Sequence, residues 1–314
     1  MTQYAGRRLL QIVPVIILVS IVVFAMMRLI PGDPVLVLVG PDAPQEVVDQ
    51  MRIKMALDHP MWEQYLVWVR NILRGDLGVS FINGYPVSRL INSKLPATMQ
   101  LSAAALVVAL LISLPTGIIS ALQHGAWPDH LATIFTSLAM GIPSFWLGIL
   151  LVILFSLKLQ LLPPSGYVSL TENPVTGLKF IIMPALTLGI YISAVFARFI
   201  RSSILETLFQ DYVRTAYGKG LSGRLVVTRH VLRNALIPVV TVFGIQFGAL
   251  LGGAVITETI FDWPGVGRLL VQSIQNRDYS IVQALILLAV MVYLVVNLFT
   301  DLLYGAIDPR VRRQ

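Results

Sequence analysis

The sequence offers few side chains that could carry out covalent chemistry. It contains no cysteine, which excludes a thiolate nucleophile, a disulfide and a cysteine-ligated metal site. The four histidines, at positions 59, 124, 130 and 230, form neither a triad nor an H-E-x-x-H pattern. One serine lies in the short pattern Gly220-Leu221-Ser222-Gly223, where a hydroxyl could act as a nucleophile. Lys219 and Arg224 flank this pattern and place Ser222 in water rather than in a dry pocket, so catalysis is the weaker interpretation.

A cluster of basic residues between two apolar blocks is the more distinctive feature. The stretch DYVRTAYGKGLSGRLVVTRHVLRNALIP, residues 211–238, combines Lys and Arg residues with two glycine-containing turns and a closing proline. Ser203 and Glu206 form a capping-box pattern, which predicts a helix that starts there and stops at Gly220. A second helical piece is expected from about residue 224 to residue 234. Two short helices around a turn predict a stiff element that passes force from a soluble partner; a basic helix resting on anionic lipid is the alternative.

Six apolar blocks are long enough to cross a bilayer. With 56% hydrophobic and 12% charged residues, the chain is too apolar for a soluble surface, and about 20 helical residues span the hydrocarbon of a membrane. We therefore predict an all-α membrane protein with one transmembrane domain over residues 1–314. Its spans are expected at residues 9–29, 97–122, 130–157, 180–201, 235–257 and 281–304. The first block has a longer apolar core than a signal peptide and lacks a cleavage pattern, so it is interpreted as a retained span.

The distribution of positive charge orients these six spans. Leaving out the long loop at residues 30–96, one face carries twelve Lys/Arg residues: Arg7, Arg8, Arg198, Arg201, Arg214, Lys219, Arg224, Arg229, Arg233, Arg310, Arg312 and Arg313. The short loops opposite carry four: Lys158, Lys179, Arg268 and Arg277. The positive-inside rule then predicts that both termini and the segment at residues 202–234 are cytoplasmic, while the 30–96 and 258–280 loops are external. The net charge of +7 is attributed to this topology, and no nucleic-acid partner is expected.

The long external loop is patterned rather than a simple connector. From Pro60 onward, apolar and aromatic residues recur at helical spacing and predict an amphipathic helix that ends at Gly75. An earlier helix is expected from Pro44. The aromatic residues, Trp62 among them, suit a cap at the membrane boundary, and packing against the spans explains them equally well.

The predicted fifth span carries a stripe of small residues. Gly244, Gly248 and Gly252 recur every four residues and allow close approach of another helix. That helix belongs either to the same chain or to a second membrane subunit across a seam. Gln246 on the same span is interpreted as a helix–helix hydrogen bond or as a residue facing a transport pathway.

The predicted spans carry almost no ionisable residues. Arg198 and Asp301 lie at their cytoplasmic ends, so proton- or sodium-driven transport is disfavoured and the energy must come from elsewhere. The chain has no G-x-x-x-x-G-K-[ST] loop, and ATP would therefore have to bind to another chain. No His-rich or acidic cluster is present in the spans, and we expect no metal and no cofactor on this chain.

The basic segment resembles the EAA loop of ABC-importer permeases, whose pattern is Glu-Ala-Ala, three residues and then Gly. Here Arg214-Thr215-Ala216 precedes Gly220 at that spacing. The chain also resembles, along nearly its whole length, the dipeptide, oligopeptide, nickel and glutathione permease family. The segments that carry this resemblance are PGDP at 31–34, GDLGVS at 75–80, LPAT at 95–98, ARFIRSS at 197–203, ETIFDWPGVGR at 258–268, NRDYSIVQ at 276–283 and DLLYGAIDPRVR at 301–312. Arg214 departs from the acidic residue of the general pattern, and the usual Ile-x-Leu-Pro ending appears at residues 230–233 with its proline displaced to Pro238.

The resemblance implies the type I ABC importer permease fold, with EAA-type coupling helices between spans 4 and 5. It implies a multi-pass subunit of the bacterial cytoplasmic (inner) membrane that works with a second homologous permease subunit, two cytoplasmic ATPase subunits and an extracytoplasmic solute-binding protein. The ATPase-coupling residues implied are Asp211, Tyr212, Arg214, Thr215, Ala216, Lys219, Gly220, Leu221, His230, Arg233 and Asn234. The candidate contacts to the binding protein are Trp62, Glu258, Trp263 and Arg268.

Substrate identity is the least determined part of this interpretation. Short peptides are the expected cargo, and nickel, other metal chelates or glutathione are the alternatives within the same kind of transporter. Two alternatives come from other classes of protein. One is a stand-alone channel or secondary carrier, and the other is a membrane-embedded hydrolase that uses Ser222.

Overall fold

The computed structural model describes residues 2–29, 34–40, 42–54 and 57–307, and their regular structure is helical. The first half contains α1 (Thr2–Leu29), α2 (Pro34–Val39), α3 (Gln45–Lys54), α4 (Met61–Leu73), α5 (Val87–Leu122), α6 (Trp127–Gly141), α7 (Ser144–Leu151) and the π-helical segment η1 (Val152–Lys158). The second half contains α8 (Pro174–Leu208), α9 (Asp211–Gly218), α10 (Gly223–Leu225), the π-helical segment η2 (Val226–Val231), α11 (Leu232–Gly253), α12 (Val255–Ile260), α13 (Val266–Gln275) and α14 (Tyr279–Ile307).

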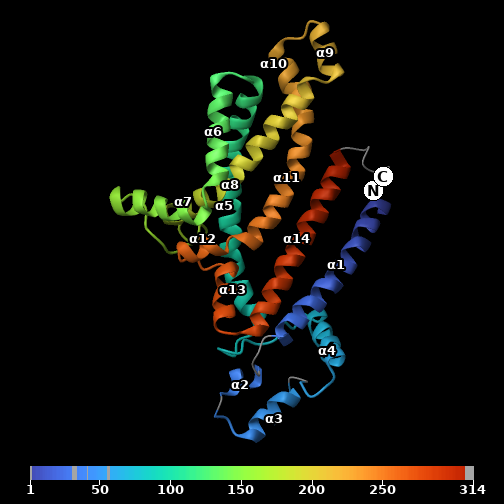
Figure 1. Cartoon of the computed structure of the whole chain (residues 1–314), viewed down its shortest axis with the longest axis vertical. Coiled ribbons are helices and arrows are strands. Elements are labelled where there is room, and N and C mark those ends of the chain that lie inside the picture. Colours follow the sequence, from blue (N-terminus) through green and yellow to red (C-terminus); the bar gives the residue numbers. More distant parts are fainter. Residues whose placement is uncertain (1, 30–33, 41, 55–56, 308–314) are drawn as a thin grey trace.

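The long helices run roughly along one axis (Figure 1), with α9 and α10 at one end and α2, α3 and α4 at the other. Among the described residues, three helices are long and apolar enough to cross a membrane: Val87–Leu122, Pro174–Leu208 and Tyr279–Thr300. A fourth span results if the bent pair Trp127–Gly141 and Ser144–Lys158 counts as one. The apolar part of α1, Leu10–Met26, is shorter. The structure therefore confirms an all-helical membrane fold, while six spans stay a prediction.

The centre of the molecule is the pairing of α5 with α8, the most extensive helix contact in the part of the chain that the structure describes. These helices have 36 and 35 residues, so each is about 50 Å long and extends beyond a hydrocarbon layer of about 30 Å. Two glycines allow their backbones to approach. A Cβ at Gly117 would come within 2.9 Å of the Ala197 carbonyl oxygen, and one at Gly189 within 2.8 Å of the Ala105 carbonyl oxygen.

The predicted third span is not a straight helix. Helix α6 ends at Gly141 and α7 begins at Ser144, with a bend of 100° between the two arms. Pro143 explains the break, because it has no backbone N–H and pushes the preceding residue out of the helical region. Ile142 accordingly has the extended dihedral angles φ −82° and ψ 122°. The continuous apolar run of residues 130–157 did not reveal this bend.

The capping box predicted at Ser203 and Glu206 is wrong. Helix α8 continues through both residues to Leu208, because Ile200, Ile204 and Thr207 prolong its buried stripe. Instead of capping a new helix, the Ser203 hydroxyl donates a hydrogen bond of 2.6 Å to the Ala235 carbonyl oxygen. This bond ties α8 to the first turns of α11.

The glycine stripe of the fifth span packs within the chain. A Cβ at Gly244 would overlap the Thr300 side chain on α14, and one at Gly248 would lie 3.1 Å from the Tyr293 ring. Of the two interpretations, these two contacts support close packing in the same chain over a seam with a second subunit. The surroundings of Gly252 lie outside the described residues.

The amphipathic helix predicted in the loop at residues 30–96 is present as α4 and packs on α1. The Phe24 ring lies 5.5 Å from the Tyr65 ring and 5.7 Å from the Trp68 ring, measured between centroids. The hydroxyls of Ser20 and Tyr65 are 2.8 Å apart. Trp62, in the first turn of α4, has 63% of its surface exposed. Packing on a span therefore accounts for two of the three aromatic residues.

Candidate coupling surface and translocation pocket

The basic segment forms a compact helical element beyond the ends of α8 and α11 (Figure 1). Helix α9 follows α8 after a two-residue turn, and α10 and η2 lead directly into α11. Gly220 has φ +77°, a left-handed conformation that suits glycine at the turn after α9. The predicted turn between two helical pieces is present, but the first helix begins at Asp211 rather than Ser203, and the second piece continues without a break into α11.

The inner face of this element is anchored in the hydrophobic core. Val213, Val226 and Val231 are fully buried, and Ala216 is nearly so. They belong to the same apolar cluster as the α5 and α8 side chains at the centre of the molecule, and half-buried Leu221 packs against it. Ala216 and Leu221 were predicted to contact an ATPase, but the structure places both on the anchoring side.

The outer face carries most of the other predicted coupling residues, and we call it the α9 surface. Its members are exposed: Phe209, Asp211, Tyr212, Arg214, Thr215, Tyr217 and Lys219. Asn234 Nδ2 donates 3.1 Å to the Tyr212 hydroxyl and 2.9 Å to the His230 carbonyl oxygen, which fixes α9 against the start of α11. Arg233 is exposed and His230 half-buried beside this bond.

Sequence reasoning missed two aromatic members of the α9 surface. Phe209 is 79% exposed and Tyr217 is 47% exposed. The helix predicted from Ser203 to Gly220 would have run through Phe209 without a break. The turn at residues 209–210 breaks that periodicity and directs the ring outward. Exposed aromatic side chains on an anchored element are typical of residues that dominate a protein interface.

A second feature is a pocket of about 440 Å³ beside the α6–α7 bend, between α8 and α11. Its lining is apolar apart from Ser144, Tyr191 and Gln246, and it contains no charged side chain. The volume is in the range of small-molecule sites. Gln246 lines this pocket.

The segment ETIFDWPGVGR, residues 258–268, closes on itself around a buried carboxylate. Glu258 has no exposed surface. Thr98 Oγ1 donates 2.6 Å to Glu258 Oε1, and the Arg268 N–H donates 2.8 Å to Glu258 Oε2. Thr98 in turn accepts 2.9 Å from the Val266 N–H. A Cβ at Gly265 would overlap the Glu258 carboxylate, so only glycine fits there. Burial raises the pKa of Glu258 above its ordinary value, and the hydrogen bond from Thr98 opposes this rise.

Two of the predicted binding-protein contacts therefore lie inside the molecule. Glu258 and Trp263 are both 0% exposed and offer no surface to a partner in this conformation. Trp263 Nε1 donates 2.9 Å to the Ala97 carbonyl oxygen, which fastens the segment to α5. Arg268 is partly exposed and pairs with Asp262 at 2.5 Å. Only Trp62 and Arg268 of the four remain available for contact.

A helical membrane chain with an anchored, outward-facing helical element between the long helices α8 and α11 has the architecture expected of a membrane permease subunit. Residues 113–313 match the profile described as "Binding-protein-dependent transport system inner membrane component", and residues 1–102 match the profile of its N-terminal part. The chain belongs to this family. It is a non-catalytic permease subunit of an ABC importer, integral to the inner membrane.

Curated relatives extend over the whole chain. The glutathione transport system permease protein GsiC of Escherichia coli O6:H1 (strain CFT073) is 41% identical over 312 residues, covering 99% of both chains. GsiC of Shigella flexneri serotype 5b (strain 8401) is 40% identical over the same length and coverage. Among solved structures, an inward-facing conformation of the MetNI methionine ABC transporter has a TM-score of 0.58 at 14% identity, covering 70% of this chain and 97% of that chain. This likeness concerns the fold.

Replacing Thr98 by valine tests the buried carboxylate. Thr98→Val keeps the volume but removes the donor to Glu258 and the acceptor for the Val266 N–H, leaving buried polar groups unpaired. We expect a loss of about 2 kcal/mol in the free energy of unfolding, measured by thermal unfolding in detergent. Thr259→Val is the control, because Thr259 is exposed and bonds only within its own helix. Equal melting temperatures for the two variants would contradict the role given to Glu258.

Proposed function

We propose that this chain forms half of the translocation pathway of an ATP-driven importer. It pairs with a second permease subunit of the same family, two cytoplasmic ATPase subunits bind ATP and Mg²⁺, and an external solute-binding protein delivers the substrate. The observation that carries the proposal is the α9 surface, an exposed aromatic and basic face held rigidly on α8 and α11. A family of binding-protein-dependent permeases implies ATPase and binding-protein partners in general.

The proposed substrate is glutathione. Full-length relatives at 41% identity carry that name, which favours glutathione over the di- and oligopeptides expected from the sequence. Glutathione is itself a short peptide, so both substrates present amide groups. The pocket near Gln246 and Tyr191 offers neutral hydrogen-bonding side chains and no fixed charge. Such a lining suits passage of a peptide whose selection occurs in the binding protein.

The proposed topology has six spans with both termini in the cytoplasm. The start of α1 and the end of α14 lie side by side, in the half of the molecule nearer to α9 (Figure 1), as an even number of crossings requires. The excess of Lys/Arg on that face supports the cytoplasmic assignment.

The proposed mechanism uses the rigidity of the coupling element. Closure of the ATPase subunits on ATP moves the α9 surface, and the buried Val213 and Val231 transmit the movement to the core without deformation. Helices α8 and α11 then move together, because the Ser203 hydroxyl holds Ala235. The pocket between them opens alternately to the two sides of the membrane.

Truncating Tyr217 should weaken binding of the ATPase subunits. Tyr217→Ala removes an exposed ring from the α9 surface without opening the core, so we expect about tenfold weaker association and an unchanged melting temperature. The measurement is retention of the ATPase subunits on the purified permease. Tyr85→Ala, equally exposed near the N-terminus of α5, should retain them fully. Equal retention by both variants would argue against docking at α9.

One experiment in proteoliposomes tests both the substrate and the class of transporter. We expect ATP hydrolysis by the assembled transporter to rise severalfold with binding protein loaded with reduced glutathione, and little with a dipeptide or a nickel chelate. If only dipeptide-loaded binding protein stimulated ATP hydrolysis, a dipeptide would be the substrate instead of glutathione, and the protein would still be part of an ATP-driven importer. Gradient-driven flux through this chain without ATPase subunits would instead make it a secondary carrier.

The absence of native cysteines permits a direct test of topology. Ser222→Cys, in the exposed turn before α10, should react with a membrane-impermeant maleimide only when the cytoplasmic face is accessible. Asn83→Cys, exposed in the loop before α5, should react only from outside and serves as the control. Labelling of residue 222 in intact cells would reverse the orientation.

A further inference from the structure

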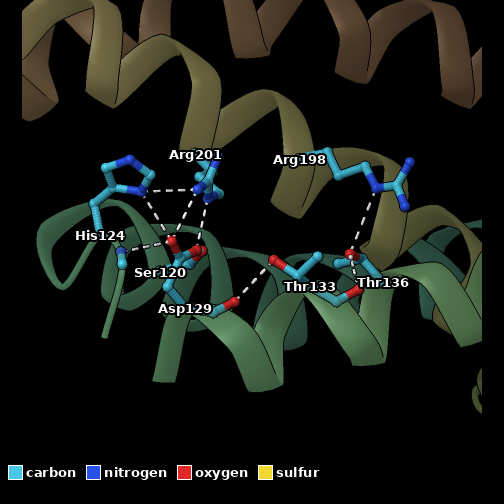
Figure 2. A network of polar contacts seen from close by, with 8 residues as sticks. Ser120, His124, Asp129, Thr133, Thr136, Arg198 and Arg201 are labelled. Atoms are coloured by element: carbon cyan, nitrogen blue, oxygen red, sulfur yellow. Dashed lines mark hydrogen bonds and ion pairs between the residues drawn. The ribbon is translucent and has the colours of Figure 1, made fainter. Parts of the chain in front are cut away.

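A pocket of about 260 Å³ lies between α5, α6 and α8, on the half of the molecule that carries α9. Two arginines of α8, Arg198 and Arg201, border it together with Thr133 and Thr136 of α6. Figure 2 shows both guanidinium groups directed from α8 toward α6. The function proposed above assigns no role to this pocket.

The charge of Arg201 is already neutralised inside the protein. Its Nε donates 2.7 Å to Asp129 Oδ1 and its Nη2 donates 2.8 Å to Asp129 Oδ2. The Ser120 hydroxyl donates 2.5 Å and the Gly125 N–H donates 3.0 Å to the same buried carboxylate. His124 Nδ1 lies 2.9 Å from it. On this side of the pocket, the positive charge of Arg201 is therefore compensated by the carboxylate of Asp129.

Arg198 differs, because its partners among the described residues are neutral hydroxyls. Its Nε donates 3.4 Å to Thr136 Oγ1, and its Nη2 donates 3.0 Å to Ser137 Oγ. A guanidinium group has five N–H donors, so three remain for a ligand. These contacts leave one uncompensated positive charge at the pocket.

The neighbouring hydroxyls supply few competing donors. Thr136 Oγ1 donates 3.1 Å to the Thr133 carbonyl oxygen, and Thr133 Oγ1 donates 2.8 Å to the Asp129 carbonyl oxygen. Their protons are thus used within α6, and the Thr136 oxygen accepts the hydrogen bond from Arg198. A ligand that only accepts hydrogen bonds and carries negative charge, such as a phosphodiester, matches what the pocket leaves unsatisfied.

The surroundings of Arg198 are those of a lipid-facing surface. Phe199 follows it on α8, and Ile134 and Leu138 lie near Ser137 on α6; all three side chains are exposed. Ser137 lies ten residues after the first residue of α6, about 15 Å into the helix. An arginine near the end of a membrane span extends its guanidinium group toward the headgroup region, where lipid phosphates can accept its hydrogen bonds.

We propose that Arg198 binds the phosphate of an anionic phospholipid in the cytoplasmic leaflet, with the acyl chains along Ile134 and Leu138. Basic pockets between membrane helices are known lipid-headgroup sites. The bound lipid would bridge α6 to α8, the helix that carries the α9 surface. The leaflet rests on the topology proposed above, whereas the binding chemistry does not.

The test uses the full-length chain in its assembled transporter, delipidated in detergent. Phosphatidylglycerol, phosphatidylcholine and inorganic phosphate are added separately, and retained lipid is counted by native mass spectrometry alongside the melting temperature. We expect the wild type to retain phosphatidylglycerol in preference to phosphatidylcholine. The Arg198→Gln variant should retain about fivefold less phosphatidylglycerol than the wild type. Arg198→Lys should keep part of it, because the charge remains but the planar fork is lost.

Arg229→Gln is the matched control, since Arg229 is an exposed arginine of η2 outside the pocket and the charge change is identical. It should retain lipid as wild type does. An equal loss in Arg229→Gln would reduce the effect to general charge attraction and overturn the site. Equal stabilisation by inorganic phosphate would show a free-anion site instead of a lipid site. Unaltered retention in Arg198→Gln, with its melting temperature intact, would also overturn the proposal.

Discussion

The close approach of α5 and α8 is the constraint on which the rest of the structure depends. Where Gly117 and Gly189 lie, the backbone of one helix contacts the other, and neither position has room for a side chain. In a bilayer, where burial of apolar groups gives little drive for association, such close packing stabilises a helix pair. Because both helices are longer than the hydrocarbon layer of a membrane is thick, other segments of the chain can pack against their ends outside that layer. One end anchors α9, and the other receives Trp263 and Glu258 through Ala97 and Thr98.

This arrangement links the two ends of the molecule through rigid contacts. The core cluster includes Val213 of α9, Val226 of η2, the buried stripes of α5 and α8, and Trp263 of the segment at residues 258–268. A packed interior does not deform continuously, so displacement of α9 moves the helices as bodies. The sharp bend beside this core, at Pro143, lies next to the pocket that Gln246 lines.

Local patterns in the sequence predicted much of the fold and part of the site. Helical periodicity and charge identified the element at residues 211–234, and aromatic spacing identified α4. The failures have a common physical cause, since they depended on contacts distant in sequence. Glu258 was predicted to be exposed and to contact the binding protein. In the structure it is buried, because Thr98, 160 positions away, donates a hydrogen bond to it and Gly265 has no side chain to occupy its space. Ser203 was predicted to cap a helix, but in the structure its hydroxyl donates a hydrogen bond to the Ala235 carbonyl oxygen, 32 positions away. The break at Pro143 was readable from proline chemistry, but the uninterrupted apolar run obscured it.

The contact between Gly265 and the Glu258 carboxylate has a consequence for how this protein can change over evolutionary time. Any larger residue at position 265 overlaps the acid, and a shorter residue at 258 would leave the Thr98 hydroxyl and the Arg268 N–H without their acceptor. A substitution at either position alone would therefore lower the stability of the folded chain. Descendants of this chain should therefore keep both residues or exchange them in one concerted step, so that two positions seven apart are inherited as a single unit.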